Sequence, residues 1–290
     1  MKMRICTLIA GVALGSISFT GTTRAAGVFL EDNFDSYANQ AAFEAAWTPI
    51  ASGTPSSAIL STEQALSLSN SIKIEATGTT SNLYRNRRSF TESGAASLFE
   101  PIVFSIDFYD TLPAGNPQRN YSNLQDSTAP SGTNQLISLG LNNTQLTTES
   151  GGNFYMARIL GYTPPTIDPN GGPDEKAGLA SGAYFKLNDF GAGLRTEGWH
   201  NLKVVISTDD GLSTDFAFYV DNILAEHVLN VGTAATIRSY DNVTLGSGVS
   251  NGAAAAYFDN VKVESIPEPA SLAMLSLGGA ALLFGRRRQR

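Results

Sequence analysis

The sequence is poor in the residues that carry most redox, zinc and nucleophilic chemistry. Its 290 residues include one cysteine, Cys6, and two histidines, His200 and His227. One cysteine forms no intrachain disulfide and no zinc cluster. A Ser-His-Asp triad has two histidines to draw on, and the chain contains no Gly-x-Ser-x-Gly elbow and no nucleotide-binding glycine signature. These absences make enzymatic activity the less favoured interpretation.

Basic residues are scarce in the middle of the chain. Residues 27–266 hold 12 of the 19 Lys and Arg but 25 of the 26 Asp and Glu, a formal charge of −13. Such a surface repels phosphates and anionic lipids, so we expect neither nucleic acid nor a membrane surface as partner. Arg85, Arg87 and Arg88 form the one basic cluster of this region. The cluster either grips an acidic glycan or balances nearby carboxylates, and the second interpretation is favoured.

The first 26 residues have the pattern of a secretory signal peptide. Lys2 and Arg4 precede an apolar stretch over residues 8–19, and small residues lead into Gly27. This order predicts export and removal of residues 1–26. Cys6 lies within that segment, so we expect the mature protein to contain no thiol.

The last 24 residues combine three features in a fixed order. Pro267, Glu268 and Pro269 precede an apolar run over residues 270–284, and four arginines follow between positions 286 and 290. This order resembles the PEP-CTERM sorting signal of Gram-negative bacteria. The resemblance implies that an exosortase-type membrane peptidase recognises residues 267–290 and passes the protein to the cell surface or the extracellular matrix.

The length of that apolar run supports a temporary membrane contact. Its 15 residues are fewer than the roughly 20 that span a bilayer. The positive-inside bias places the terminal arginines in the cytoplasm. We therefore expect the membrane to hold the tail transiently. An ordinary C-terminal anchor is the alternative.

Between the two signals, short segments of alternating polarity predict one all-β domain over residues 27–266. In residues 102–109, Phe104, Ile106 and Phe108 share one face, a period of two that is typical of a half-buried strand. Similar runs predict strands at residues 71–76, 136–141, 154–160, 183–187, 202–207, 216–220, 223–228, 240–245 and 257–264. One short helix is expected at 40–47, and no strand within 111–133 or 161–182. This pattern predicts an antiparallel sandwich or barrel.

Four short patches resemble the concanavalin A-like (laminin-G-like) jelly rolls. They are the run from Trp199 to Val204, the run from Phe218 to the turn at Asp221-Asn222, the opening residues 32–37 and the closing residues 257–263. The resemblance implies an antiparallel β-sandwich of jelly-roll type in which the first and last strands pair. We expect Phe104, Ile106, Phe108, Leu202, Val204, Ile206, Phe216 and Phe218 in its core.

The chain contains a candidate site for a structural calcium ion. Asp259 alternates in step with Val261 and Val263, so a regular strand turns its carboxylate toward the core, where it needs a partner. The jelly-roll resemblance implies Ca²⁺ held by Asp259, Glu31 and Asp32, and oxygen ligands suit this ion. The alternative is that Asp259 caps a bend through hydrogen bonds.

Tyrosines are the candidate ligand-binding residues. Tyr109, Tyr121, Tyr155 and Tyr162 combine a ring that stacks on sugars with a hydroxyl that tolerates water. No spacing in the chain matches the paired carboxylates of a glycosidase. We therefore expect an exported surface or matrix protein with a non-enzymatic, carbohydrate-binding sandwich. The alternatives are a polysaccharide hydrolase or lyase on the same scaffold and a purely structural matrix component.

Overall fold

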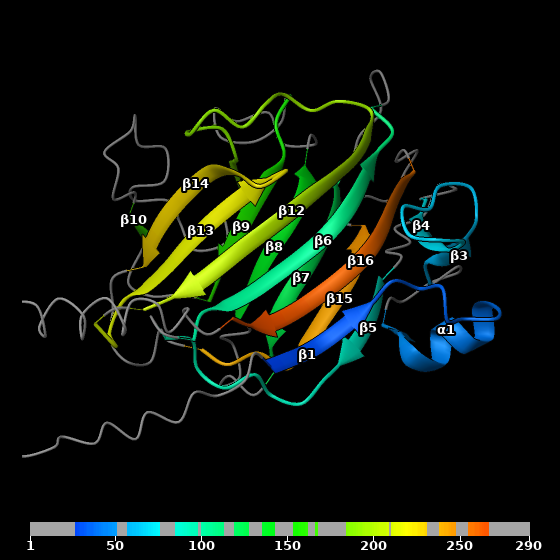
Figure 1. Ribbon diagram of the computed structural model, residues 1–290, viewed down its shortest axis with the longest axis horizontal. Coiled ribbons are helices and arrows are strands. Elements are labelled where there is room, and N and C mark those ends of the chain that lie inside the picture. The colour runs from blue at the N-terminus through cyan, green and yellow to red at the C-terminus, as the bar shows by residue number, and fades with distance from the viewer. Residues whose placement is uncertain are drawn as a thin grey trace, which may run out of the picture.

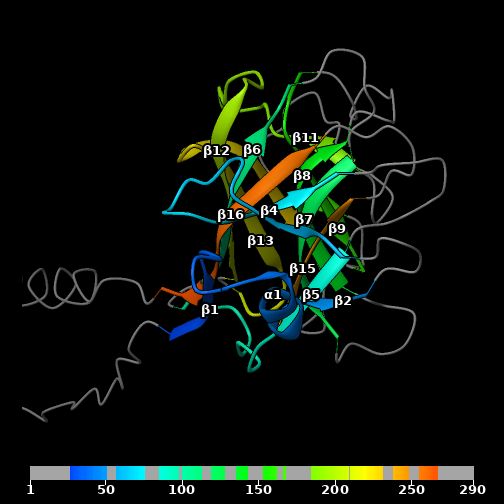
Figure 2. The same cartoon turned by 90° about the vertical axis from the view of Figure 1, so that its right-hand side faces the viewer.

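The alternating segments form two stacked antiparallel sheets. A computed structural model describes residues 27–50, 57–75, 85–97, 100–112, 119–127, 135–142, 153–161, 166–167, 184–208, 210–230, 238–247 and 255–266. The predicted signal peptide and the sorting residues Pro267, Glu268 and Pro269 lie outside these ranges. Figure 1 shows one sheet face-on with the other behind it, and Figure 2 shows the two layers edge-on.

Nine strands make up the first layer, sheet A. Their order is β10 (Thr166–Ile167), β14 (Ile223–Asn230), β13 (Thr214–Val220), β12 (Gly198–Ser207), β6 (Ile102–Asp110), β16 (Ala256–Ser265), β4 (Ser71–Ile74) and β3 (Ile59–Ser61). The ninth strand, β1 (Gly27–Asp32), pairs with the second half of β16. The first and last strands therefore pair, as the jelly-roll resemblance implies.

Seven strands make up the second layer, sheet B. Their order is β11 (Tyr184–Lys186), β9 (Met156–Leu160), β8 (Gln135–Asn142), β7 (Arg119–Asp126), β15 (Asn242–Ser247), β5 (Arg85–Ser89) and β2 (Thr48–Pro49). The expected short helix is α1 (Gln40–Ala46), which begins where the Asn39 side chain accepts a hydrogen bond from the Ala42 amide. Within the ranges given above, no helix is both long and apolar enough to cross a membrane.

The core lies between the two sheets. All eight residues expected there are at most 1% exposed. They face Leu124, Ile137, Leu139, Val243 and Leu245 of sheet B in one apolar cluster. The tight turn at Asp221-Asn222 is also confirmed, because both residues have positive φ, 51° and 64°, as a two-residue type I′ hairpin requires.

Strands β7 and β10 correct the prediction that residues 111–133 and 161–182 contain no strand. Strand β7 pairs with β8 on one side and β15 on the other, in the middle of sheet B. The sequence of β7 does not reveal a strand, because the residues on its buried face, Asn120 and Ser122, are polar. They are fully buried on the face opposite Tyr121 and Asn123. With polar residues on both faces, the strand has no period-two hydrophobic signal.

A bulge in β16 corrects the expected orientation of Asp259. The register with β6 shifts between Asp259 and Lys262, and Asn260 there adopts a positive φ of 47°. One extra residue reverses the alternation. Phe258 therefore faces the core together with Val261, whereas Asp259 lies opposite Asp107 on the outer face.

Candidate functional site

The outer face of sheet B is hollowed into a groove of about 430 Å³. The strand register explains which side chains meet in it. Opposite residues on neighbouring strands point to the same face, and here they form one row from β11 to β5. In order, the row contains Tyr184, Arg158, Ser138, Asn123, Thr244 and Arg87.

The middle of this row is neutral, polar and buried. Asn123, Ser138 and Thr244 are at most 5% exposed. The Asn123 side-chain amide donates to Thr244 Oγ1 at 3.0 Å, and the Ser138 hydroxyl donates to Asn123 Oδ1. These bonds fix an amide and two hydroxyls in the floor of the groove.

The neighbouring row leaves space around Tyr121. Its cross-strand neighbours are Gly140 on β8 and Gly246 on β15. Gly140 has φ of 153°, and a Cβ there would lie 2.2 Å from the Asn120 carbonyl oxygen, so no other residue fits. Without side chains on either side, the Tyr121 ring borders the hollow directly. Burial raises the pKa of Tyr121, against the opposing effect of nearby arginines.

Four arginines line the groove: Arg85, Arg87, Arg119 and Arg158. The Arg119 and Arg158 guanidinium carbons lie 5.6 and 5.3 Å from the centre of the Tyr184 ring, within the range of cation–π attraction. Within the part of the chain that the structure describes, no carboxylate forms an ion pair with any of the four. The groove therefore concentrates positive charge on a domain whose net charge is negative.

Several buried donors in the groove also lack partners. The Nε atoms of Arg85, Arg119 and Arg158 and the hydroxyl of Tyr184 have no hydrogen-bond partner among the described residues. A buried donor without a partner costs about 1–3 kcal/mol. Four such atoms lie together in the groove, and a ligand that provides acceptors would satisfy them.

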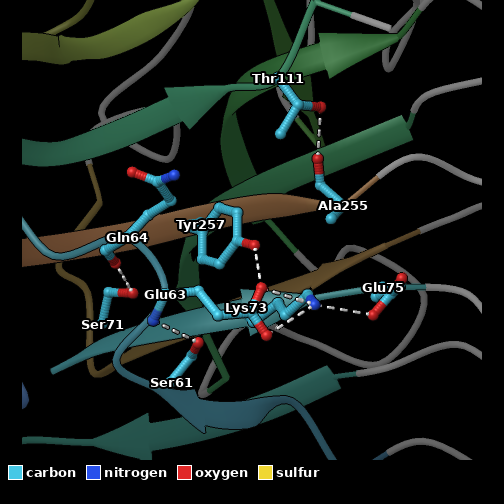
Figure 3. Close-up of polar contacts among 9 residues, drawn as sticks. All are labelled: Ser61, Glu63, Gln64, Ser71, Lys73, Glu75, Thr111, Ala255 and Tyr257. Atoms are coloured by element: carbon cyan, nitrogen blue, oxygen red, sulfur yellow. Dashed lines mark hydrogen bonds and ion pairs between the residues drawn. The ribbon is translucent and has the colours of Figure 1, made fainter.

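Several basic side chains elsewhere in the described structure pair with carboxylates. Arg195 makes two bonds of 2.7 and 2.8 Å to the buried Asp110 carboxylate. Lys73 lies between Glu63 at 2.9 Å and Glu75 at 3.0 Å, with the Tyr257 hydroxyl also donating to Glu63 (Figure 3). In contrast, four cations without a described ion pair lie together in the groove.

The predicted tyrosines do not form one site. Tyr121 lines the groove, but Tyr155 is 1% exposed, packs against Phe108 and belongs to the core. Tyr109 lies on the outer face of sheet A, where its ring contacts the rings of Trp199 and Tyr257 edge-on. Tyr162 lies outside the described residues.

The predicted calcium ligands are engaged in other contacts. The Asp259 carboxylate accepts the amides of Leu66 and Ser67 at 2.9 and 3.0 Å; burial raises its pKa, whereas these bonds lower it. The Asp32 carboxylate pairs with Arg88 and accepts the Trp47 indole N–H at 2.9 Å. Glu31 has a 66% exposed side chain. Within the described residues, no three acidic, histidine or cysteine side chains are arranged to hold a metal ion.

A second pocket, of about 660 Å³, lies where β1, β6 and β16 meet. Its central carboxylate, Asp107, accepts hydrogen bonds from the side-chain amides of Asn201 and Asn260, both at 2.8 Å. Arg88 at its rim pairs with Asp32. Because these polar groups satisfy one another, this pocket makes a weaker case for a ligand than the groove does.

Sequence reasoning missed most of the groove. Arg119 and Asn123 lie on the unpredicted strand β7, and Arg158 and Tyr184 lie on predicted strands but far apart in sequence. One signal was available. Alternation along residues 85–88 places Arg85 and Arg87 on one face and Arg88 on the other, so the cluster divides between a groove and a salt bridge.

Comparisons with known proteins agree with the fold and with the C-terminal signal. Residues 265–289 match the PEP-CTERM protein-sorting motif, which marks an exported protein that is sorted to the cell envelope or surface. No curated protein matches the chain in sequence.

Among solved structures, the chain is similar to a carbohydrate esterase of the Shiga toxin-encoding bacteriophage phi24B, with 12% identity, 83% of this chain and 99% of that chain covered and a TM-score of 0.50. The chain is also similar to the globular domain of T. cruzi calreticulin, with 10% identity, 86% of this chain and 91% of that chain covered and a TM-score of 0.48. For alginate lyase Aly36B the identity is 11%, the coverage is 81% of this chain and 95% of that chain, and the TM-score is 0.47. The chain has an all-β antiparallel sandwich of the concanavalin A-like jelly-roll type.

Substitutions of Arg85 and Arg195 test whether an arginine serves ligand binding or the stability of the fold. Arg85→Gln removes a charge without a carboxylate partner and relieves repulsion in the groove, so we expect the free energy of unfolding to stay unchanged or to rise by up to about 1 kcal/mol. Arg195→Gln leaves Asp110 buried and unpaired, so we expect a loss of about 3–5 kcal/mol. Urea unfolding measures both. A loss of more than about 2 kcal/mol for Arg85→Gln would make Arg85 a structural residue.

The contacts of Glu31, Asp32 and Asp259 favour the alternative to the predicted calcium site, in which hydrogen bonds hold the Asp259 carboxylate. An ion must displace Arg88 from Asp32 and two amides from Asp259. We therefore expect that neither calcium chloride nor a chelator shifts the thermal midpoint of the wild-type protein. A midpoint that rises with calcium in the wild type, but not in Asp259→Asn, would show that the ion binds there.

Proposed function

We propose that this protein is exported by a Gram-negative bacterium, is sorted by an exosortase to the cell surface or extracellular matrix, and binds a polysaccharide there without cleaving it. The PEP-CTERM match supports the first part. The observation that carries the second part is the groove of sheet B. In it, the unpartnered donors of Arg158 and Tyr184 lie in one row with fixed amide and hydroxyl groups, and those of Arg85 and Arg119 also line the groove.

The shape and chemistry of the groove suit a sugar polymer. Tyr121 and Tyr184 border the groove with an aromatic edge and a hydroxyl, and Asn123, Ser138 and Thr244 offer partners for sugar hydroxyls. The row from Tyr184 to Arg87 crosses five inter-strand spacings of about 4.8 Å, so it is about 24 Å long. That length accommodates several linked sugar rings.

The residues of the groove favour binding over hydrolysis. Among its described lining residues there is no Asp, Glu or His. Glycoside hydrolysis needs a pair of carboxyl groups around the scissile bond. A polysaccharide lyase or hydrolase on this scaffold is the alternative, and a matrix component without a ligand is another.

A glycan array with the purified mature protein tests the proposal. We expect binding to at least one polysaccharide class without release of new reducing or unsaturated ends. Tyr184→Phe removes one unpartnered hydroxyl and should weaken binding by about 3- to 10-fold, the value of one hydrogen bond. Tyr219→Phe, on the outer face of sheet A, is the matched control and should bind like the wild type. Released ends would indicate an enzyme, and a blank array would leave the purely structural interpretation.

The sorting step generates a separate expectation. Replacing Pro267 and Pro269 by alanine removes the extended backbone that proline imposes ahead of the apolar run. We expect this variant to stay full-length in the inner membrane, and a variant without residues 267–290 to be released in soluble form. Fractionation and intact-mass measurement in a host with an exosortase decide the matter. Mature wild-type protein that keeps Arg286 to Arg290 would contradict cleavage of the tail.

A further inference from the structure

We infer that the ligand of the groove is a polyanionic saccharide whose carboxylate or sulfate groups are held by Arg85, Arg87, Arg119 and Arg158. The inference rests on the proposed carbohydrate binding and adds the chemical class of the ligand. Neutral sugars need hydroxyl, amide and aromatic partners, which the middle of the groove provides. They do not require four guanidinium groups.

The concentration of charge is the first argument. These four arginines are a third of the 12 Lys and Arg in residues 27–266, a region of formal charge −13. Electrostatic screening in physiological salt acts over about 8 Å, so the groove attracts an anion locally while the remaining surface repels it. A polyanion is therefore bound only along the groove.

The absence of internal partners is the second argument. Arg88 follows Arg87 on β5 but points to the other face, where it pairs with Asp32. Nothing comparable holds the groove arginines, since no described carboxylate pairs with them and three of their Nε atoms are buried without an acceptor. A guanidinium group can donate two parallel hydrogen bonds to the oxygens of one carboxylate or sulfate group. Such oxygens satisfy the unused donors.

The spacing of the charges is the third argument. Arg158 lies next to Tyr184 near one end of the row, and Arg87 lies at the other end. The two arginines are four inter-strand spacings of about 4.8 Å apart, or about 19 Å. Arg119 joins the first end through the shared Tyr184 ring, and Arg85 shares β5 with Arg87. One small anion cannot reach both ends. The arrangement fits a polymer that repeats its charge, with neutral sugar groups over Asn123 and Ser138.

Two pairs of polymers that differ in charge alone test the inference by titration calorimetry on the mature protein. The pairs are polygalacturonate against its methyl ester, and dextran sulfate against dextran. We expect one charged member to bind and its neutral counterpart to bind at least about 10-fold more weakly, because bonds to charged groups are the stronger ones. Raising sodium chloride from about 50 to about 500 mM should weaken the binding about 10-fold or more. The member that binds identifies the oxyanion.

Single variants locate the effect. Arg87→Gln and Arg158→Gln should each weaken binding of the charged polymer about 10- to 100-fold, the range for a hydrogen bond to a charged partner. Lys203→Gln removes the same charge from the outer face of sheet A and should bind within about twofold of the wild type. Thermal midpoints confirm that each variant is folded.

The remaining outcomes are each decisive. Equal binding of charged and neutral polymers would overturn the inference and leave the proposed carbohydrate binding intact. Binding of neither member of either pair, while the array finds a neutral glycan, would have the same meaning. Binding of no glycan at all would overturn both. Equally tight, arginine-dependent binding of a single-stranded oligonucleotide would show that the groove recognises anionic charge without recognising sugar.

Discussion

The two-residue alternation of sheet B is the constraint on which the rest of the structure depends. Val243 and Leu245 of β15 are fully buried against sheet A, so Thr244 and Gly246 must face outward. Residues also alternate between the core and the outer face along β7, β8 and β9. Closing the core on one face therefore aligns Arg158, Ser138, Asn123 and Thr244 on the other. The groove is a consequence of the register that builds the core.

Charge is distributed unevenly between the two outer faces. On sheet A, Lys73 and Lys262 each bond to a glutamate, and Asp107 is bracketed by two amides. On sheet B, four like charges lie together and three of their Nε atoms are buried without acceptors. Such an arrangement opposes folding. Natural proteins keep locally unfavourable groups of this kind where binding needs them.

Parts of this structure could be predicted from the sequence because the hydrophobic alternation there is regular. Strand β6 is predicted by the alternating residues Phe104, Ile106 and Phe108. Strand β12 is predicted in the same way by Leu202, Val204 and Ile206. Strand β7 could not be found in this way, since its buried face carries Asn120 and Ser122. Because β7 was not predicted, neither the centre of sheet B nor the centre of the groove could be predicted.

Two other departures have local physical causes. The bulge at Asn260 inserts one residue into β16, so simple alternation gave Asp259 the wrong face. The carboxylate is buried because the amides of Leu66 and Ser67 cover it. Tyr155 was expected at the surface, but it fills space beside Phe108 and His200. Neither a bulge nor a loop that covers a strand has a signature in hydrophobic periodicity.

If the groove arginines hold an anionic sugar through donors that the protein leaves unused, those donors must change when the sugar binds. The side-chain N–H resonances of arginine Nε can be followed by NMR during titration with oligogalacturonate or a sulfated oligosaccharide. We expect the Nε–H signals of Arg85, Arg119 and Arg158 to shift. The signal of Arg195, which already donates to Asp110 at 2.7 Å, should not move. Binding that leaves the three groove signals unchanged would mean that these arginines do not hold the sugar.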